Sequence, residues 1–213
     1  MAQSVSVLLF DLGKVILDFD YGRAVERLKE TCDKRPEELM ALFYQSNLDH
    51  LFEEGRISPN QFFEGVQSAL GLRCNYETFV PIWNEIFTEM PDTIRLLEEA
   101  RRRYRLFLIS NTNVLHFDYV RKEYPVLAWM EGTILSHEVH CRKPSLPIFE
   151  AAIRLAGVRP EEIFYTDDHP EFVEAAGRLG IRGAPFTSAA LLRQALAQAG
   201  VILNGLDGTK GSP

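Results

Sequence analysis

The hydrophobic residues near the N-terminus form one short run. Residues 5–10 are almost all apolar, and the run stops at a carboxylate, Asp11, with Gly13 two positions later. A run this brief is too short for a helix and is typical of a strand buried in a parallel sheet. Such a strand would bring Asp11 to the carboxyl edge of the sheet, where open α/β proteins bind ligands. Gly13 is expected to turn the backbone over that edge. A strand ending in a capping aspartate would give the same pattern.

The pattern changes after this first predicted strand. Residues 14–20 are too few and too rich in β-branched residues for a helix, and they predict a small flap or hairpin over the strand end. Residues 21–90 have helical apolar spacing throughout, including a capping box formed by Ser58 and Gln61. No stretch of residues 21–90 is typical of a strand, so this part of the chain predicts about four helices.

Short apolar runs and amphipathic segments alternate from Pro91 onward, and Asp92 is expected to cap the first of the helices. The predicted strands are residues 106–109, 133–135, 163–165 and 181–185. Further helices are predicted at residues 146–156, 171–179 and 188–199. Strands that alternate with helices imply a parallel sheet with right-handed crossovers.

The predicted fold class is therefore α/β, a doubly wound parallel sheet with an all-helical cap inserted after the first strand. Residues 1–18 and 91–203 form the predicted core, and residues 19–90 form the cap. A cap in this position would stand over the carboxyl edge of the sheet as a lid. Residues 204–213 are rich in glycine and are expected to be a disordered tail.

The composition narrows the classes of partner. The chain is 46% hydrophobic and 25% charged, as in ordinary globular proteins, and its net charge of −7 argues against nucleic acid or an anionic membrane as a partner. It has no apolar run long enough to cross a bilayer and no signal-like start, so a cytoplasmic location is expected. Cys32, Cys74 and Cys141 are widely spaced and predict free thiols without a zinc site. A monomer and a homodimer are both compatible with the sequence.

Side chains that can carry chemistry follow successive predicted strands. Taken singly, each has a simple explanation as a helix cap, a turn residue or a surface cation. The carboxyl ends of parallel strands meet at one edge of a sheet, however, so these side chains are expected to converge there. They are Asp11, Ser110, Asn111, Lys143, Asp167 and Asp168.

This combination suits phosphoryl transfer. Carboxylates from two strand ends would supply oxygen ligands for Mg²⁺, which binds one or two protein carboxylates together with a substrate phosphate. The metal and Lys143 would offset the repulsion between an anionic substrate and an anionic nucleophile. Ser110 would hydrogen-bond a phosphoryl oxygen, and Asp11 would attack phosphorus to form an aspartyl-phosphate.

The order and placement of these motifs resemble the haloacid dehalogenase-like (HAD) hydrolases over nearly the whole chain. The matching segments are Phe-Asp-Leu-Gly-Lys-Val at residues 10–15, Ile-Ser-Asn-Thr at 109–112, Lys-Pro at 143–144 and Asp-Asp at 167–168. Closer still, Asp-Leu-Gly-x-Val, Leu-x-Ser-Asn-Thr-Asn-x-Leu-His and Arg-Lys-Pro resemble the bacterial α-glucose-1-phosphate phosphatase branch. The resemblance implies a Rossmann-like core and a helical cap.

The resemblance also implies a role for each site residue. Asp11 would be the nucleophile and a ligand of Mg²⁺, the Gly13 carbonyl a second ligand, and Asp168 a third, with Asp167 beside it. Ser110 and Lys143 would bind the transferring phosphoryl group. Asn111 would contact the substrate or orient the nucleophile.

One position departs from the family pattern. Most phosphatases of the family carry a second aspartate two residues after the nucleophile, where it protonates the leaving group, but this chain has Gly13 there. A general acid accelerates such reactions by roughly 10²- to 10⁴-fold. A sugar 1-phosphate, whose leaving oxygen needs less protonation, would suffer less from the loss. The side chains considered as replacement acids are Asp18, Asp20, His116 and His169.

The predicted function is a Mg²⁺-dependent phosphatase of a small phosphorylated metabolite such as a sugar phosphate. Two alternatives stay open. One is a metal-free 2-haloacid dehalogenase in which Asp11 attacks carbon, and the other is a non-catalytic protein that binds a phosphorylated ligand. Aromatic residues of the predicted cap would either form its core or set the substrate choice, and they include Phe43, Tyr44, Phe52 and Trp83.

Overall fold

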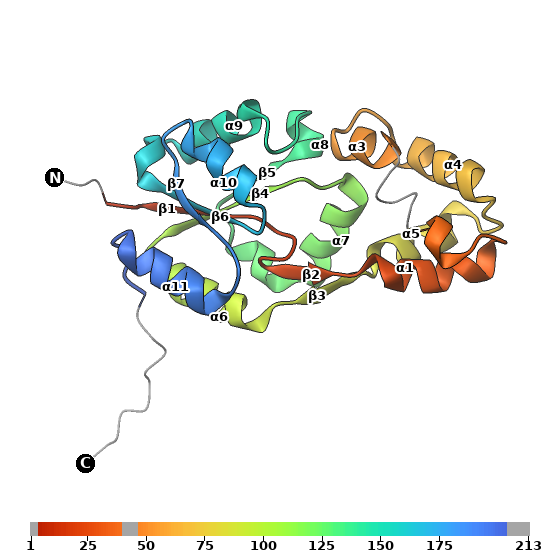
Figure 1. The fold of residues 1–213 in the computed structure, drawn as a ribbon, viewed down its shortest axis with the longest axis horizontal. Coiled ribbons are helices and arrows are strands. Elements are labelled where there is room, and N and C mark those ends of the chain that lie inside the picture. The colour runs from red at the N-terminus through yellow and green to blue at the C-terminus, as the bar shows by residue number, and fades with distance from the viewer. Residues whose placement is uncertain (1–3, 40–46, 204–213) are drawn as a thin grey trace, which may run out of the picture.

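The computed structural model describes residues 4–39 and 47–203 (Figure 1). Its main sheet has five parallel strands in the order β5-β4-β1-β6-β7. The strands are β1 (Val7–Phe10), β4 (Arg105–Ser110), β5 (Gly132–Leu135), β6 (Ile163–Asp167) and β7 (Arg182–Pro185). The predicted doubly wound α/β fold is confirmed, and the apolar run near the N-terminus is its central strand.

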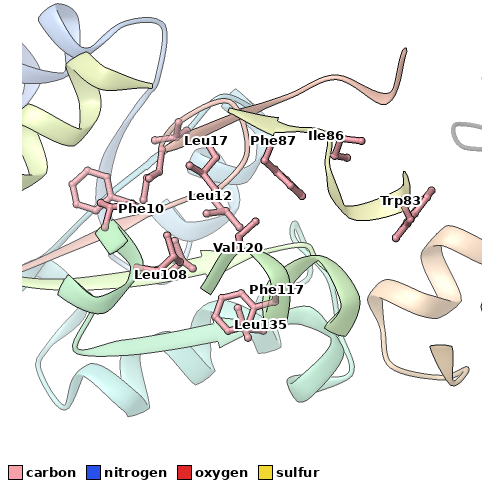
Figure 2. Close-up of a cluster of buried hydrophobic side chains, with 14 of the residues drawn as sticks. Phe10, Leu12, Leu17, Trp83, Ile86, Phe87, Leu108, Phe117, Val120 and Leu135 are labelled. Atoms are coloured by element: carbon pink, nitrogen blue, oxygen red, sulfur yellow. The ribbon is translucent and has the colours of Figure 1, made fainter. Parts of the chain in front are cut away.

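Helices cover both faces of this sheet because successive strand residues point to opposite sides. Leu8 and Phe10 belong to the hydrophobic cluster formed with α6 (Pro91–Ala100), α7 (Val114–Glu123) and α11 (Ala189–Gln198). Val7 and Leu9 belong to the cluster with α9 (Leu146–Ala156) and α10 (Pro170–Gly177). Figure 2 shows the first cluster reaching from Leu108 and Leu135 on the sheet, past Phe117, toward the inserted helices. A central strand buried on both faces explains why its sequence is a continuous apolar run.

The insertion after β1 is helical, as predicted, and its helices lie together at one end of the molecule (Figure 1). They are α1 (Tyr21–Leu28), α3 (Asn47–Glu53), α4 (Pro59–Leu70) and α5 (Tyr76–Asn84). The capping box of Ser58 and Gln61 begins α4 as expected. Phe52 and Trp83 are fully buried in the insertion, and both contact the Phe62 ring, so they are core residues. Phe43 and Tyr44 lie outside the described residues.

Two short strands correct the prediction for this region. β2 (Leu17–Phe19) pairs antiparallel with β3 (Phe87–Glu89), so residues 14–20 do not form a hairpin of their own. The prediction that residues 21–90 contain no strand is wrong at β3, which follows the end of α5 at Asn84. A three-residue strand has almost no periodicity, and its partner is distant in sequence. This two-stranded ribbon carries the chain from the core to the insertion and back.

Other details of the core differ in smaller ways. Helix α6 begins at Pro91 with Met90 as its N-cap, so Asp92 lies inside the first turn and pairs with Arg95 instead of capping. Helix α7 was not predicted from its sequence. The predicted tail, residues 204–213, lies outside the described residues. In the described ranges no helix has the length and apolar character needed to span a membrane.

Candidate active site

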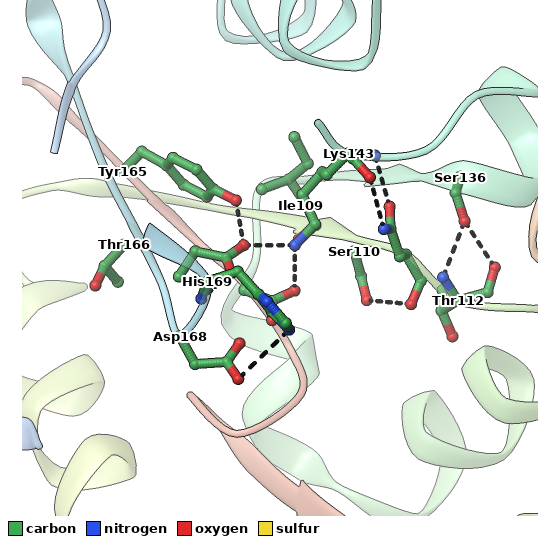
Figure 3. A network of polar contacts seen from close by, with 12 residues as sticks. Ile109, Ser110, Thr112, Ser136, Lys143, Tyr165, Thr166, Asp168 and His169 are labelled. Carbon is green, nitrogen blue, oxygen red and sulfur yellow. Dashed lines mark hydrogen bonds and ion pairs between the residues drawn. The ribbon is translucent and has the colours of Figure 1, made fainter. Parts of the chain in front are cut away.

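The backbone of the central strand fixes the position of Asp11. Its N–H donates to the Thr166 carbonyl oxygen at 3.0 Å, which extends the pairing of β1 with β6 by one residue. Asp167 is the last residue of β6, and Ser110 is the last residue of β4. These three side chains are buried, and the next residue, Asp168, is half-buried. The predicted convergence at the carboxyl edge of the sheet is therefore observed for these residues (Figure 3).

Lys143 connects the carboxylates. Its Nζ donates to Asp11 Oδ1 at 2.7 Å and to Asp167 Oδ2 at 2.6 Å, and its side chain is only 2% exposed. The backbone of Lys143 is held by Asn111, whose Oδ1 accepts from the Lys143 N–H at 2.8 Å and whose Nδ2 donates to the Lys143 carbonyl at 3.1 Å. Both ends of the Asn111 amide are thus engaged in positioning Lys143. The sequence left open whether this asparagine meets the substrate.

The carboxylate oxygens of Asp167 accept more hydrogen bonds than those of Asp168. Both oxygens of Asp167 accept hydrogen bonds, Oδ1 from the His169 N–H at 2.9 Å and Oδ2 from Lys143 and the Tyr165 hydroxyl. Asp168 Oδ2 lies 3.8 Å from Nε2 of the His169 ring. The Asp168 carboxylate therefore has more free capacity for an external ligand than Asp167.

The electrostatics of the cluster reflect burial. Burial raises the pKa of Asp11 to about 7; the Lys143 charge opposes this shift, and the Asp167 charge adds to it. Burial also disfavours the Lys143 charge, but Asp11 and Asp167 outweigh it and raise the pKa of the ammonium group. Burial raises the pKa of Asp168 as well. Crowded, buried carboxylates of this kind are stabilised by an additional cation.

The donor set fits a hard divalent cation. One carboxylate oxygen from each of Asp11, Asp167 and Asp168 lies within 4.8 Å of the others. Oxygen ligands on two adjacent strand ends suit Mg²⁺, which keeps several of its waters and needs few protein ligands. Gly13 lines the same cavity, and its predicted carbonyl ligand role stays a prediction.

The structure explains the glycine at position 13 by the space around it, and not by the backbone turn that the sequence predicts. Its backbone does not adopt a left-handed conformation; the positive φ of 57° belongs to Lys14 instead. A Cβ at position 13 would lie 2.8 Å from Cε1 of Phe19, a residue of β2. Glycine therefore allows the close approach of the Phe19 ring, and the same lack of a side chain removes the usual acid.

A cavity of about 250 Å³ lies over the site. Asp11, Ser110 and Lys143 line it from the core, and Glu53, the last residue of α3, lines it from the insertion. Glu53 was missed in the sequence because a glutamate near the end of a helix is typical of a solvated face. Only the packing of the insertion against the core brings it to the cavity.

The structure separates the four side chains considered as replacement acids. Asp18 is ion-paired with Lys14 and about half exposed, while Asp20 caps α1 by accepting the Gly22 N–H at 2.8 Å. His116 is buried, and burial lowers its pKa to about 4, so it is neutral. His169 lines the cavity on the carboxylate side, next to Asp168.

The sheet order, the helical insertion and this carboxylate–lysine edge define a hydrolase of the HAD class. A model of the haloacid dehalogenase-like hydrolases matches residues 5–180, and the chain belongs to this family. Three L-2- or 2-haloacid dehalogenase structures share the fold at 16–19% identity, among them the enzyme from Xanthobacter autotrophicus with a TM-score of 0.64.

Relatives with higher identity come from Bacteroides thetaiotaomicron. A D-ribitol-5-phosphate phosphatase of that organism is 26% identical over 206 residues, covering 92% of this chain and 98% of the relative. A HAD family enzyme of the same organism, crystallised with magnesium and inorganic phosphate, is 30% identical with a TM-score of 0.76, covering 86% of this chain and 95% of that one. A sugar-alcohol phosphatase thus appears among the relatives in place of the α-glucose-1-phosphate phosphatase branch.

Proposed function

We propose that this protein is a Mg²⁺-dependent phosphatase of a small phosphorylated metabolite, with residues 1–18 and 91–203 as the catalytic core and residues 19–90 as the cap. The main support is one observation. Lys143 Nζ contacts both Asp11 and Asp167 at the edge of a cavity that Asp168 and Ser110 also line. The relative crystallised with magnesium and inorganic phosphate supports the same two ligands for this chain.

In this proposal Asp11 attacks phosphorus through a carboxylate oxygen, and the alcohol oxygen departs on the opposite side. Lys143 holds Asp11 in place and offsets the charge of the incoming phosphate. The Ser110 hydroxyl, which donates to the Asn111 carbonyl oxygen at a long 3.4 Å, turns to donate to a phosphoryl oxygen. Mg²⁺ held by Asp11, Asp168 and the Gly13 carbonyl supplies charge neutralisation. Water then hydrolyses the aspartyl-phosphate.

We infer a sugar-alcohol or sugar phosphate as the substrate class. The D-ribitol-5-phosphate phosphatase among the relatives favours a linear polyol phosphate over α-glucose 1-phosphate. A cavity of about 250 Å³ with charged walls suits a small polar metabolite. Such a substrate has an alkyl leaving group, which makes proton donation to the leaving oxygen more important than it would be for a sugar 1-phosphate.

A panel of phosphorylated metabolites, assayed for phosphate release with Mg²⁺ and with chelator, tests the proposal. We expect polyol and pentose phosphates to be turned over only with Mg²⁺. Asp11→Asn should abolish turnover, while Asp92→Asn, an exposed carboxylate far along the chain, serves as the matched control. Wild-type activity in Asp11→Asn would exclude the nucleophile assigned here.

Two companion assays, halide release and thermal melting, distinguish the alternative functions from the proposed one. A dehalogenase would release halide from 2-haloacids in the presence of chelator; the clustered carboxylates, which favour a cation, count against it. A non-catalytic binding protein would show a higher melting temperature with a sugar phosphate but no phosphate release. Neither alternative has a specific structural observation in its favour, since haloacid dehalogenase structures below 20% identity share only the fold.

A further inference from the structure

The missing carboxylate at position 13 leaves the leaving group without an evident proton donor. Asp18, Asp20 and His116 are engaged elsewhere, and His169 lies on the carboxylate side of the cavity. In an in-line displacement the leaving oxygen points away from the nucleophile. The donor should therefore lie on a cavity wall apart from the strand end that carries Asp11, and the insertion supplies part of such a wall.

Glu53 is placed on that wall. It ends α3, its side chain is 13% exposed, and it lines the 250 Å³ cavity together with Asp11 and Lys143. It also lines a smaller adjoining cavity of about 70 Å³ with Gly13, the position of the missing acid. Glu53 therefore lines the same two cavities as Gly13, the position at which the usual acid is missing.

Contacts with the core hold this end of α3 in place. Glu53 Oε2 lies 2.6 Å from Arg142 Nε, an ion pair in which neither atom has a hydrogen bond of good geometry. The His140 ring, just after α8 (Ser136–Val139), has its Nδ1 2.9 Å from the Glu54 carbonyl oxygen. Glu53 is thus anchored beside the cavity while its hydrogen-bonding capacity is not used up.

Burial favours the protonated form of Glu53, while its ion pair with Arg142 favours the charged form. Burial raises its pKa to about 7; Asp49 adds to the shift, and Arg142 and Lys143 oppose it. Burial likewise raises the pKa of Asp49 to about 6. The other titratable groups around this helix end or across the cavity are His50, Glu54, His137, His140, Asp11, Asp168 and His169.

We propose that Glu53 is the general acid of the reaction, in place of the carboxylate that position 13 lacks; this rests on the phosphatase function proposed above. As the Asp11 oxygen–phosphorus bond forms and the phosphorus–alkoxide bond breaks, the Glu53 carboxyl proton passes to the departing oxygen and gives the free alcohol. The Glu53 carboxylate then takes a proton from the water that attacks the aspartyl-phosphate. Phosphate leaves, and both carboxyl groups return to their starting states.

The test compares Glu53→Gln with wild type on three phosphate esters, using kcat/KM because it reports the step in which the alcohol departs. Ribitol 5-phosphate has an alkyl leaving group with hydroxyls, ethyl phosphate an alkyl group without them, and p-nitrophenyl phosphate an acidic phenol that leaves unaided. Glu54→Gln, the neighbouring glutamate paired with Arg56, is the matched control and should behave as wild type.

We expect Glu53→Gln to lower kcat/KM by roughly 10²- to 10⁴-fold on both alkyl esters and by far less on p-nitrophenyl phosphate. Equal losses on all three esters would overturn the proposal, as would no loss on the alkyl esters. A loss confined to ribitol 5-phosphate would also overturn it and make Glu53 a polyol-binding residue. Absence of phosphatase activity in the wild type would instead refute the proposed function.

A wild-type measurement covers the case in which Glu53→Gln does not fold. The kcat/KM for ethyl phosphate should fall at alkaline pH as Glu53 loses its proton, and the fall should be much weaker for p-nitrophenyl phosphate. Coincident alkaline limbs for the two esters would contradict the assignment, because the other titrating groups of the protein act on both substrates alike.

Discussion

His116 is locked as a neutral ring between the core and the insertion. Its Nε2 lies 3.0 Å from the Trp83 carbonyl oxygen, which can only accept, so Nε2 carries the hydrogen. Nδ1 lies 3.2 Å from Asn113 Nδ2, which donates to it. Protonation would set an Nδ1–H against that amide and place a charge in a buried site stacked on Trp83. Replacing His116 with glutamine keeps a polar side chain but removes the titration.

The magnitude follows from the shift in pKa. Burial lowers the pKa of His116 from 6.5 to about 4, and one pKa unit is worth 1.36 kcal/mol, so the difference corresponds to about 3 kcal/mol. The unfolded chain binds this proton below pH 6.5 and the folded chain does not. The stabilisation that the folded protein gains from a neutral His116 is therefore complete above pH 6.5, and it is lost as the pH falls toward 4. Buried Asp11 and Glu53, whose pKa values are raised, shift stability in the opposite direction.

Urea unfolding of wild type and His116→Gln at several pH values between 7 and 4 isolates the contribution of His116 to the free energy of unfolding, because the opposing carboxylates are common to both proteins. Wild type should lose about 3 kcal/mol of unfolding free energy relative to the variant over this range. His50→Gln, an exposed histidine of α3, is the control and should run nearly parallel to wild type. If the unfolding free energies of wild type and His116→Gln change with pH in parallel, His116 is not a neutral, buried ring in the folded protein.

Two further substitutions test charge pairs in the core. Lys143→Met leaves Asp11 and Asp167 without their shared cation, so it should cost about 3–5 kcal/mol in metal-free protein, and Mg²⁺ should restore part of the melting temperature. An unchanged melting temperature would show that the three groups are not coupled. Arg193→Ala removes both hydrogen bonds that the guanidinium donates to the buried Glu99 carboxylate, and it should cost about 2–3 kcal/mol by urea unfolding. A loss below about 0.5 kcal/mol, the size expected of an exposed pair, would contradict this.

The sequence predicted most of the core because its strands are short apolar runs buried on both faces. Local patterns also predicted α4, whose capping box and Pro59 mark its start. Pairings between distant segments left no such local signal, and β2 with β3 is the example: each strand has three residues and is stabilised by a partner far along the chain. Local periodicity cannot register such a pairing.

The candidate site also combines residues that the sequence predicts with features that depend on packing. Asp11, Ser110, Lys143, Asp167 and Asp168 could be predicted because side chains that follow successive strands of a parallel sheet meet at one edge. Their detailed arrangement, such as the engagement of both Asp167 oxygens, depends on packing. Residues contributed by the insertion could not be placed at all, since the sequence does not tell which of its faces meets the core.

The central claim is that Asp11 accepts the phosphoryl group, and trapping the intermediate tests it most directly. Protein mixed with Mg²⁺ and substrate is quenched in acid, reduced with borohydride and digested, and the peptide containing Asp11 is analysed by mass spectrometry. An aspartyl-phosphate predicts reduction of residue 11 to homoserine, absent in Asp11→Asn and in the presence of chelator. Turnover with an unmodified Asp11, or modification at another carboxylate, would contradict the account.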